Sequence, residues 1–120
     1  MHGSLEDVTV ERPMEGAAVA IFEGEHDLAT APAVESLLRS LVEENELVVV
    51  DFSEAEFVDS STIHVLVKSH QAASQRGSAF RLQLGTAPIV ERAFHLSGML
   101  ELLDCVATRE DALHDRSAGT

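Results

Sequence analysis

The sequence contains no tryptophan, no tyrosine, a single cysteine, and only 8 basic residues against 21 acidic ones in 120. The lack of Trp and Tyr argues against binding by stacking on nucleic-acid bases. The net charge of −13 argues against nucleic acid or an anionic membrane as a direct partner, because both are negatively charged. A basic partner would instead be attracted to this chain.

Cys105 has no second cysteine with which to form an internal disulfide, which favours a reducing compartment. No stretch approaches the roughly 18 apolar residues of a membrane-spanning helix, and the N-terminus lacks the apolar run of a signal peptide. We therefore expect a cytoplasmic protein. With 45% hydrophobic residues, the chain is long enough for one domain with its own core. We place that domain at residues 8–114, between flexible ends at 1–7 and 115–120.

The most informative stretch begins with Leu47–Val50, a continuous apolar run typical of a strand buried on both faces. We expect Asp51 to end this strand, an acidic turn to follow, and Phe57-Val58 to return the chain to the core. Asp59-Ser60-Ser61 then precedes the apolar spacing of a helix. One of these three residues is expected to cap the helix, whose open N–H groups also attract anions.

The other apolar patterns predict an α/β fold with a mixed sheet of four to five strands and about four helices, in the order β-β-α-β-α-β-α-β-α. We expect Gly24 to end the second strand and Gly77 to follow the second helix in a left-handed conformation. The predicted strands are residues 8–10, 17–22, 47–50, 80–84 and 102–106, and the predicted helices are about 30–42, 59–77, 85–98 and 108–114.

Three segments then carry a family resemblance. Residues 51–61 (DFSEAEFVDSS) resemble the signature D-[LF]-S-x-x-x-[FY]-[VIM]-D-S-[ST] of the STAS domain family, the anti-sigma factor antagonists of bacteria. Residues 24–32 (GEHDLATAP) are similar to an early segment of that family, and residues 96–99 (LSGM) to a late one. The matches fall in family order and extend over about residues 8–114. The resemblance implies a STAS-like α/β fold.

In phosphorylatable members of this family, the serine after the Asp-Ser pair accepts phosphate from a kinase that is itself the anti-sigma factor. The resemblance therefore implies phosphorylation at Ser61, with Thr62 or Ser60 as alternatives. It implies a function as an anti-sigma factor antagonist: the unphosphorylated chain binds the kinase and releases a sigma factor, and phosphate abolishes that binding. The implied partner-binding residues are Glu25, Asp27, Thr30, Asp59, Ser60, Ser61, Thr62 and His64.

Two positions depart from the family pattern: Thr62 replaces the usual glycine, and His64 is bulky where many members carry a small residue. They favour a second hypothesis, a STAS domain that is not phosphorylated and serves as a scaffold or as the small cytoplasmic subunit of a signalling or lipid-transport complex. Asp27, taken alone, is better interpreted as a helix cap or part of a solvated acidic turn than as a partner contact.

An enzyme has weaker support than either hypothesis, because Ser60 and Ser61 lack the G-x-S-x-G motif of serine hydrolases. The six histidines also show none of the spacings typical of metal ligands. We therefore predict no enzymatic activity, no metal and no cofactor. The oligomeric state stays open.

Overall fold

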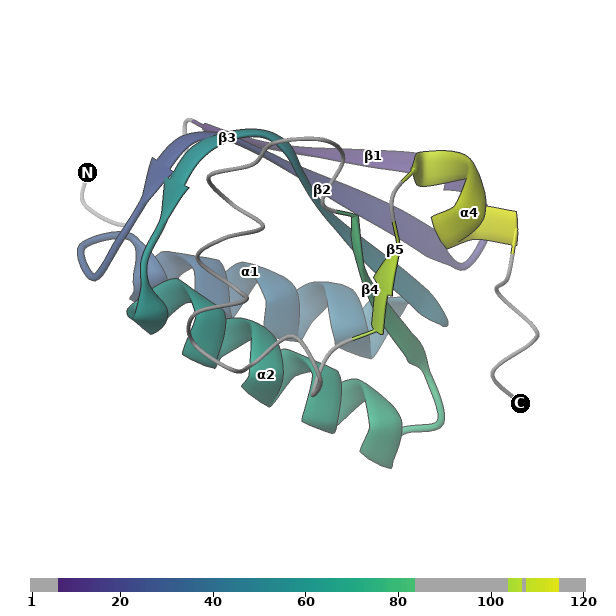
Figure 1. Ribbon diagram of the computed structural model, residues 1–120. Helices are drawn as coiled ribbons and strands as arrows, with labels where there is room; N and C mark the ends of the chain where they lie inside the picture. Colours follow the sequence, from purple (N-terminus) through teal and green to yellow (C-terminus); the bar gives the residue numbers. More distant parts are fainter. Residues whose placement is uncertain (1–6, 84–103, 107, 115–120) are drawn as a thin grey trace.

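The computed structural model describes residues 7–83, 104–106 and 108–114. Five strands form one mixed sheet in which β1 pairs antiparallel with β2 and the other neighbours are parallel. In spatial order they are β1 (Val8–Met14), β2 (Ala17–His26), β3 (Leu47–Val58), β4 (Ala79–Gln83) and β5 (Asp104–Val106). The helices α1 (Ala31–Glu44) and α2 (Ser60–Gln75) cover one face of the sheet, and α4 (Arg109–His114) lies on the other (Figure 1).

The central strand β3 separates two apolar clusters. Val48 and Val50 pack in the larger cluster beneath α1 and α2, whereas Leu47 and Val49 pack in a smaller cluster with Ala112 of α4. Alternate residues of a strand point to opposite faces of the sheet, so an uninterrupted apolar run is required where both faces are covered. The prediction of a doubly buried strand at Leu47–Val50 is confirmed.

The two long helices follow the predicted patterns. The buried residues of α1 are Ala31, Val34, Leu38, Leu41 and Val42. At the end of α2, Ser78 N donates to the carbonyl of Ala73 (2.8 Å) and Gly77 N donates to that of Ser74 (3.1 Å), the hydrogen bonds of a Schellman motif. Gly77 has φ +76°, as predicted, because a left-handed residue is needed there.

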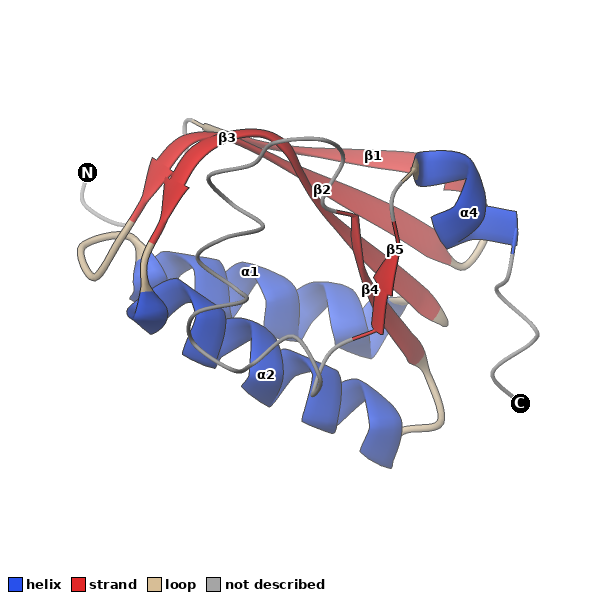
Figure 2. Ribbon diagram, in the orientation of Figure 1, coloured by secondary structure: helices blue, strands red, loops and turns tan. Residues whose placement is uncertain are grey.

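Two predicted strand ends are wrong. β3 does not end at Asp51 but continues to Val58, and β2 does not end at Gly24 but continues to His26 (Figure 2). The two extensions stabilise each other, because β2 and β3 stay paired along their length through two register shifts. Gly24 lies at one of these shifts with φ +73°, so it permits a bulge in the strand instead of ending it.

The predicted acidic turn is consequently the outer part of β3. Its pairing register with β2 shifts just after Asp51, whose Oδ1 accepts a hydrogen bond from Ser53 N (2.8 Å). The prediction that Phe57 returns to the core is also wrong, since this side chain is 46% exposed and only Val58 is buried. A large aromatic side chain is thus left on the surface where sequence patterns place it in the core.

The α/β class and the mixed sheet are confirmed, and β5 and α4 lie where the last strand and the last helix were predicted. The total of about four helices is not confirmed, because the helix predicted at 85–98 lies outside the described residues. No helix in the part of the chain that is described combines the length and the apolar character needed to cross a membrane.

Candidate functional site

The site is built around the first turn of α2, where Asp59 is the N-cap. Its backbone is extended (φ −102°, ψ 179°), and Oδ1 accepts a hydrogen bond from Thr62 N at 3.2 Å. This is the capping geometry that short acidic side chains provide at a helix start. One of the three residues Asp59, Ser60 and Ser61 was predicted to be the cap, and the structure identifies it as Asp59.

Asp59 also fixes the loop between β2 and α1. Its second oxygen, Oδ2, accepts a hydrogen bond from Leu28 N at 3.2 Å, across 31 residues of sequence. Its own backbone N–H donates to the carbonyl of His26 at 3.1 Å. One side chain therefore joins the start of α2 to the loop at residues 27–30, the two segments that the family resemblance assigned to partner binding.

Within this loop, Asp27 and Thr30 bind each other. Thr30 Oγ1 donates to the carbonyl of Asp27 and accepts from Asp27 N, both at 3.2 Å, and Asp27 Oδ1 accepts from Ala29 N at 3.0 Å. Thr30 occupies the N-cap position of α1, but its side chain does not cap that helix. Asp27 and Thr30 thus give the loop its shape, and Leu28 at its tip is 70% exposed.

The predicted site residues differ in accessibility. Ser60, His64 and Glu25 are exposed, and Ser61 is half-buried at the second position of α2. Thr62 is fully buried, and its Oγ1 has no hydrogen-bond partner among the described residues. A protein that approaches the N-terminal end of α2 can therefore reach Ser60 and Ser61 but not the Thr62 side chain.

Three residues at this site were not predicted. Leu28 and Phe57 are exposed apolar side chains beside Asp59, and His26 is buried below the loop. The His26 ring donates from Nε2 to the carbonyl of Glu23 (2.9 Å) and meets the Phe22 ring edge-on at 4.9 Å. The sequence carried one signal for Leu28: it is an isolated apolar residue in a polar loop, outside the stripe of α1.

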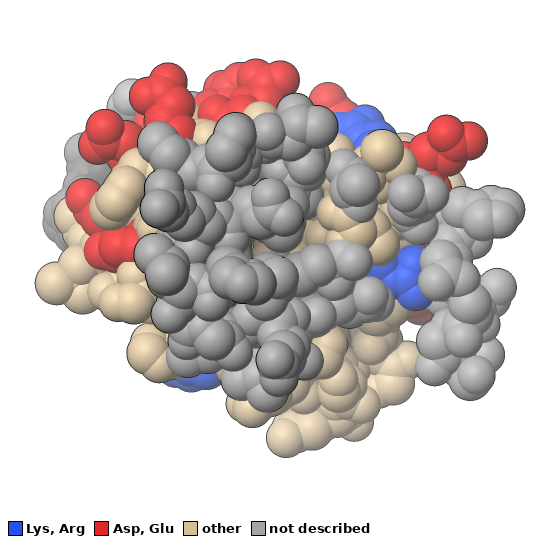
Figure 3. Space-filling view, in the orientation of Figure 1, with Lys and Arg blue, Asp and Glu red and all other residues tan. Residues whose placement is uncertain are grey.

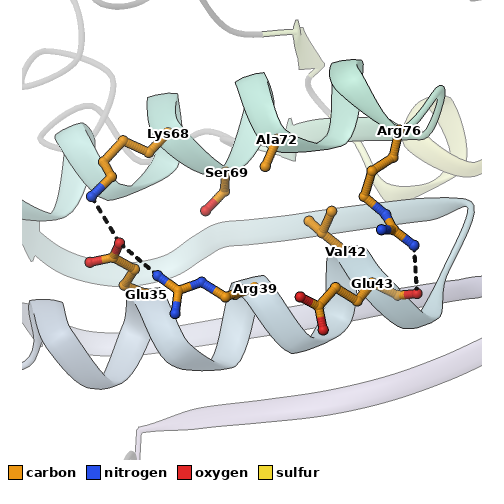
Figure 4. Close-up of a pocket in the computed structure, with 8 residues that line it drawn as sticks. All are labelled: Glu35, Arg39, Val42, Glu43, Lys68, Ser69, Ala72 and Arg76. Atoms are coloured by element: carbon orange, nitrogen blue, oxygen red, sulfur yellow. Dashed lines mark hydrogen bonds and ion pairs between the residues drawn. The ribbon is translucent and has the colours of Figure 1, made fainter.

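A separate groove of about 210 Å³ lies between α1 and α2 (Figure 4). Lys68 Nζ binds Glu35 Oε2 at 2.8 Å, and Arg39 binds the same oxygen at 3.2 Å. The Lys68 hydrogen bond, with the nearby charges of Lys68 and Arg39, lowers the pKa of Glu35 against the opposing effect of burial. The Lys68–Glu35 pair joins α2 to α1, whereas Arg39 and Glu35 pair within α1. None of the predicted site residues lines the groove. Its lining consists of Glu35, Arg39, Val42, Glu43, Lys68, Ser69, Ala72 and Arg76.

In the ranges 7–83, 104–106 and 108–114, no group of three or more His, Cys, Asp or Glu side chains is placed to hold a metal ion. The start of α2 and the neighbouring loop present an exposed hydroxyl group, carboxylates and exposed apolar side chains. Such a surface is suited to contact with another protein.

The model of the STAS domain family matches residues 14–112, and the chain belongs to this family. It is similar to an anti-sigma factor antagonist from Mycobacterium paratuberculosis, with 26% identity and a TM-score of 0.76 over 91% of this chain and 92% of that one. A comparison with curated proteins gave no match.

Two further solved structures share the fold at lower identity. The unphosphorylated form of the anti-sigma factor antagonist SpoIIAA is 20% identical, with a TM-score of 0.75 over 94% of this chain and 97% of that one. SLC26A9 is 15% identical, with a TM-score of 0.69 over 89% of this chain and 20% of that one. The fold thus occurs both as a chain of this size and as part of a longer protein.

Proposed function

We propose that this protein is an anti-sigma factor antagonist that acts in the cytoplasm by binding an anti-sigma factor kinase and releasing a sigma factor. The observation that carries the proposal is the double role of Asp59, which caps α2 and holds the loop at Leu28. This arrangement presents Ser60, Ser61 and the loop as one preorganised surface, which lowers the cost of binding. The likeness to the Mycobacterium paratuberculosis antagonist supports the same function.

Ser61 is the phosphate acceptor in this proposal. It is half-buried in the first turn of α2, where the helix dipole and open N–H groups favour an anion. Thr62, at the position where the family pattern has glycine, directs its side chain into the core. Its extra bulk therefore does not stand between a kinase and Ser61. Ser60, which is exposed, is the alternative acceptor, and the burial of Thr62 argues against phosphate transfer to its hydroxyl.

Phosphate at Ser61 would weaken binding to the kinase through charge. It adds nearly two negative charges at pH 7 at the start of α2, where a close, desolvated contact with the kinase is needed. One added charge about 6 Å from a like charge of the kinase across the interface, at an effective dielectric of about 20, costs roughly 3 kcal/mol. That energy corresponds to about a hundredfold loss of affinity, which is enough for a switch without any change of fold.

The test is incubation of the protein with ATP and each purified anti-sigma kinase from the same organism, followed by intact mass measurement and mapping of the modified residue. We expect one added phosphate on Ser61, its loss in Ser61→Ala, and its retention in the matched variant Ser60→Ala. Phosphate that persists in Ser61→Ala and disappears in Ser60→Ala would move the acceptor to Ser60.

A STAS scaffold that is not phosphorylated is the second candidate, favoured by Thr62 in place of the family glycine. It would use the same end of α2 to dock on a partner in a signalling or lipid-transport complex. Stable binding to an anti-sigma kinase without phosphate transfer would indicate a constitutive antagonist. Absence of both binding and transfer with every kinase would rule out the antagonist function and leave the scaffold.

A further inference from the structure

Two large apolar side chains near Asp59 lie on the surface. Leu28 is 70% exposed and is held by Asp59 through its backbone N–H, and Phe57, 46% exposed, precedes Asp59 by two residues. Among the described residues, only Met14 is a further exposed large hydrophobic side chain, on β1. The bond from Leu28 N to Asp59 and the pairing of Phe57 with Glu25 across β2 and β3 hold both residues near the start of α2, where burying them would contribute binding energy.

Four glutamates lie around Phe57 at the ends of β2 and β3. Glu25 on β2 lies directly across from Phe57 on β3, Glu23 lies across from Glu54, and Glu56 precedes Phe57. All four are exposed, and none of their carboxylates has a hydrogen bond or an ion pair within residues 7–83. Figure 3 shows acidic side chains gathered over the ends of β2 and β3. The result is an apolar centre with an acidic border.

We propose that Leu28 and Phe57, with the bordering residues Glu23, Glu25, Glu54 and Glu56, form a docking surface for a protein that offers an apolar pocket rimmed by Lys and Arg. The inference rests on the proposed function, so this partner is the anti-sigma factor. It adds the surface chemistry by which the protein would recognise that partner. The docking surface extends the site from the start of α2 onto the ends of β2 and β3.

The charges decide which occupant fits. A second copy of this chain would bring the same four glutamates face to face with their counterparts, and like charges in contact cost several kcal/mol. A basic rim would instead speed the encounter and select the partner. The apolar centre supplies the affinity, because buried aromatic anchors dominate binding energy while the charged border keeps water out and sets specificity.

The apolar centre is tested by calorimetric titration of the purified anti-sigma kinases with Phe57→Ser, Leu28→Ser and the matched control Met14→Ser. Met14 is 41% exposed on β1, so it controls for the loss of an exposed apolar side chain elsewhere. We expect about a thirtyfold weaker affinity for Phe57→Ser, a smaller loss for Leu28→Ser, and less than about a twofold change for Met14→Ser. Thermal melts of each variant confirm that it is folded.

The acidic border is tested by stopped-flow association with the paired variants Glu54→Lys and Glu43→Lys. Glu43 is an exposed glutamate on α1 that lines the groove between α1 and α2, so its reversal changes the net charge equally. We expect Glu54→Lys to slow association about tenfold at low salt, with the difference shrinking as salt is added. Glu43→Lys is expected to have a much smaller effect.

The failures are separable. Binding of the unmodified protein, with equal affinity for Phe57→Ser and Met14→Ser, would overturn the docking surface and leave the proposed function intact. No binding of the unmodified protein to any anti-sigma kinase would overturn the proposed function itself. Self-association that is lost in Phe57→Ser would identify a second copy as the occupant and overturn the assignment of a basic partner.

Discussion

Comparison of Asp59→Ala with Asp59→Asn separates the two structural roles of Asp59. Asp59→Ala removes the cap to Thr62 N and the bond to Leu28 N, both 3.2 Å long. The lost cap costs about 1 kcal/mol. The Leu28 bond contributes about 0.5–1 kcal/mol, because this exposed amide regains water when the bond is broken. The sum of about 1.5–2 kcal/mol corresponds to a fall of about 6–8 °C in melting temperature for a domain of this size.

Asp59→Asn provides the control, since asparagine is a good N-cap but has only one acceptor oxygen. We expect it to lose about half as much stability as Asp59→Ala in urea denaturation at pH 7. Amide hydrogen exchange reports the two bonds separately: Leu28 should exchange faster in both variants, and Thr62 only in Asp59→Ala. Equal stability of the two variants, or an unchanged Leu28 amide in Asp59→Asn, would refute the double role.

Three further predictions concern stability. Gly24→Ala should lower the free energy of unfolding by about 1–2 kcal/mol because Gly24 has a φ of +73°. Gly77→Ala, whose added Cβ meets nothing within 4 Å, should lower it by a similar amount. An unchanged urea midpoint for either variant would contradict the left-handed backbone. Thr62→Val removes a buried hydroxyl without a described partner and should stabilise the protein by about 1 kcal/mol; a net loss would reveal a partner for that hydroxyl. Glu35 has a lowered pKa when folded, so its ion pairs stabilise the protein above about pH 4.3, the usual glutamate value, and this stabilisation is lost as pH falls through the lowered pKa. Glu35→Gln should therefore be less stable at pH 7 by about 0.5–1 kcal/mol and should match the unmodified protein at low pH; a gap that persists in acid would show that charge is not its cause.

Sequence patterns predicted those elements whose burial repeats along the chain. The α1 stripe through Val34 and Leu38, and the apolar run Leu47–Val50, follow from period and composition alone. The true ends of β2 and β3 did not, because each extension depends on pairing with a strand some 30 residues away. Local signals at Asp51 and Gly24 indicated turns, and the tertiary pairing overrode them.

The candidate site was predictable to the same extent. The short polar residues before α2 indicate a helix cap, and the family pattern draws attention to Ser61, but neither shows that Asp59 reaches Leu28. That bond depends on how β2 and β3 end together. The exposure of Phe57 is a further consequence of the extended β3. Its burial was expected on the assumption that an acidic turn ends the strand before it.

The most direct test of the account is displacement of a sigma factor from its complex with the anti-sigma kinase. The release is monitored by the fluorescence anisotropy of labelled sigma factor. The unmodified protein is predicted to release the sigma factor, whereas the protein phosphorylated at Ser61 and the variant Ser61→Glu are predicted to leave it bound. Equal release by all three forms would contradict the phosphate switch, and no release by the unmodified protein with any kinase would contradict the antagonist function.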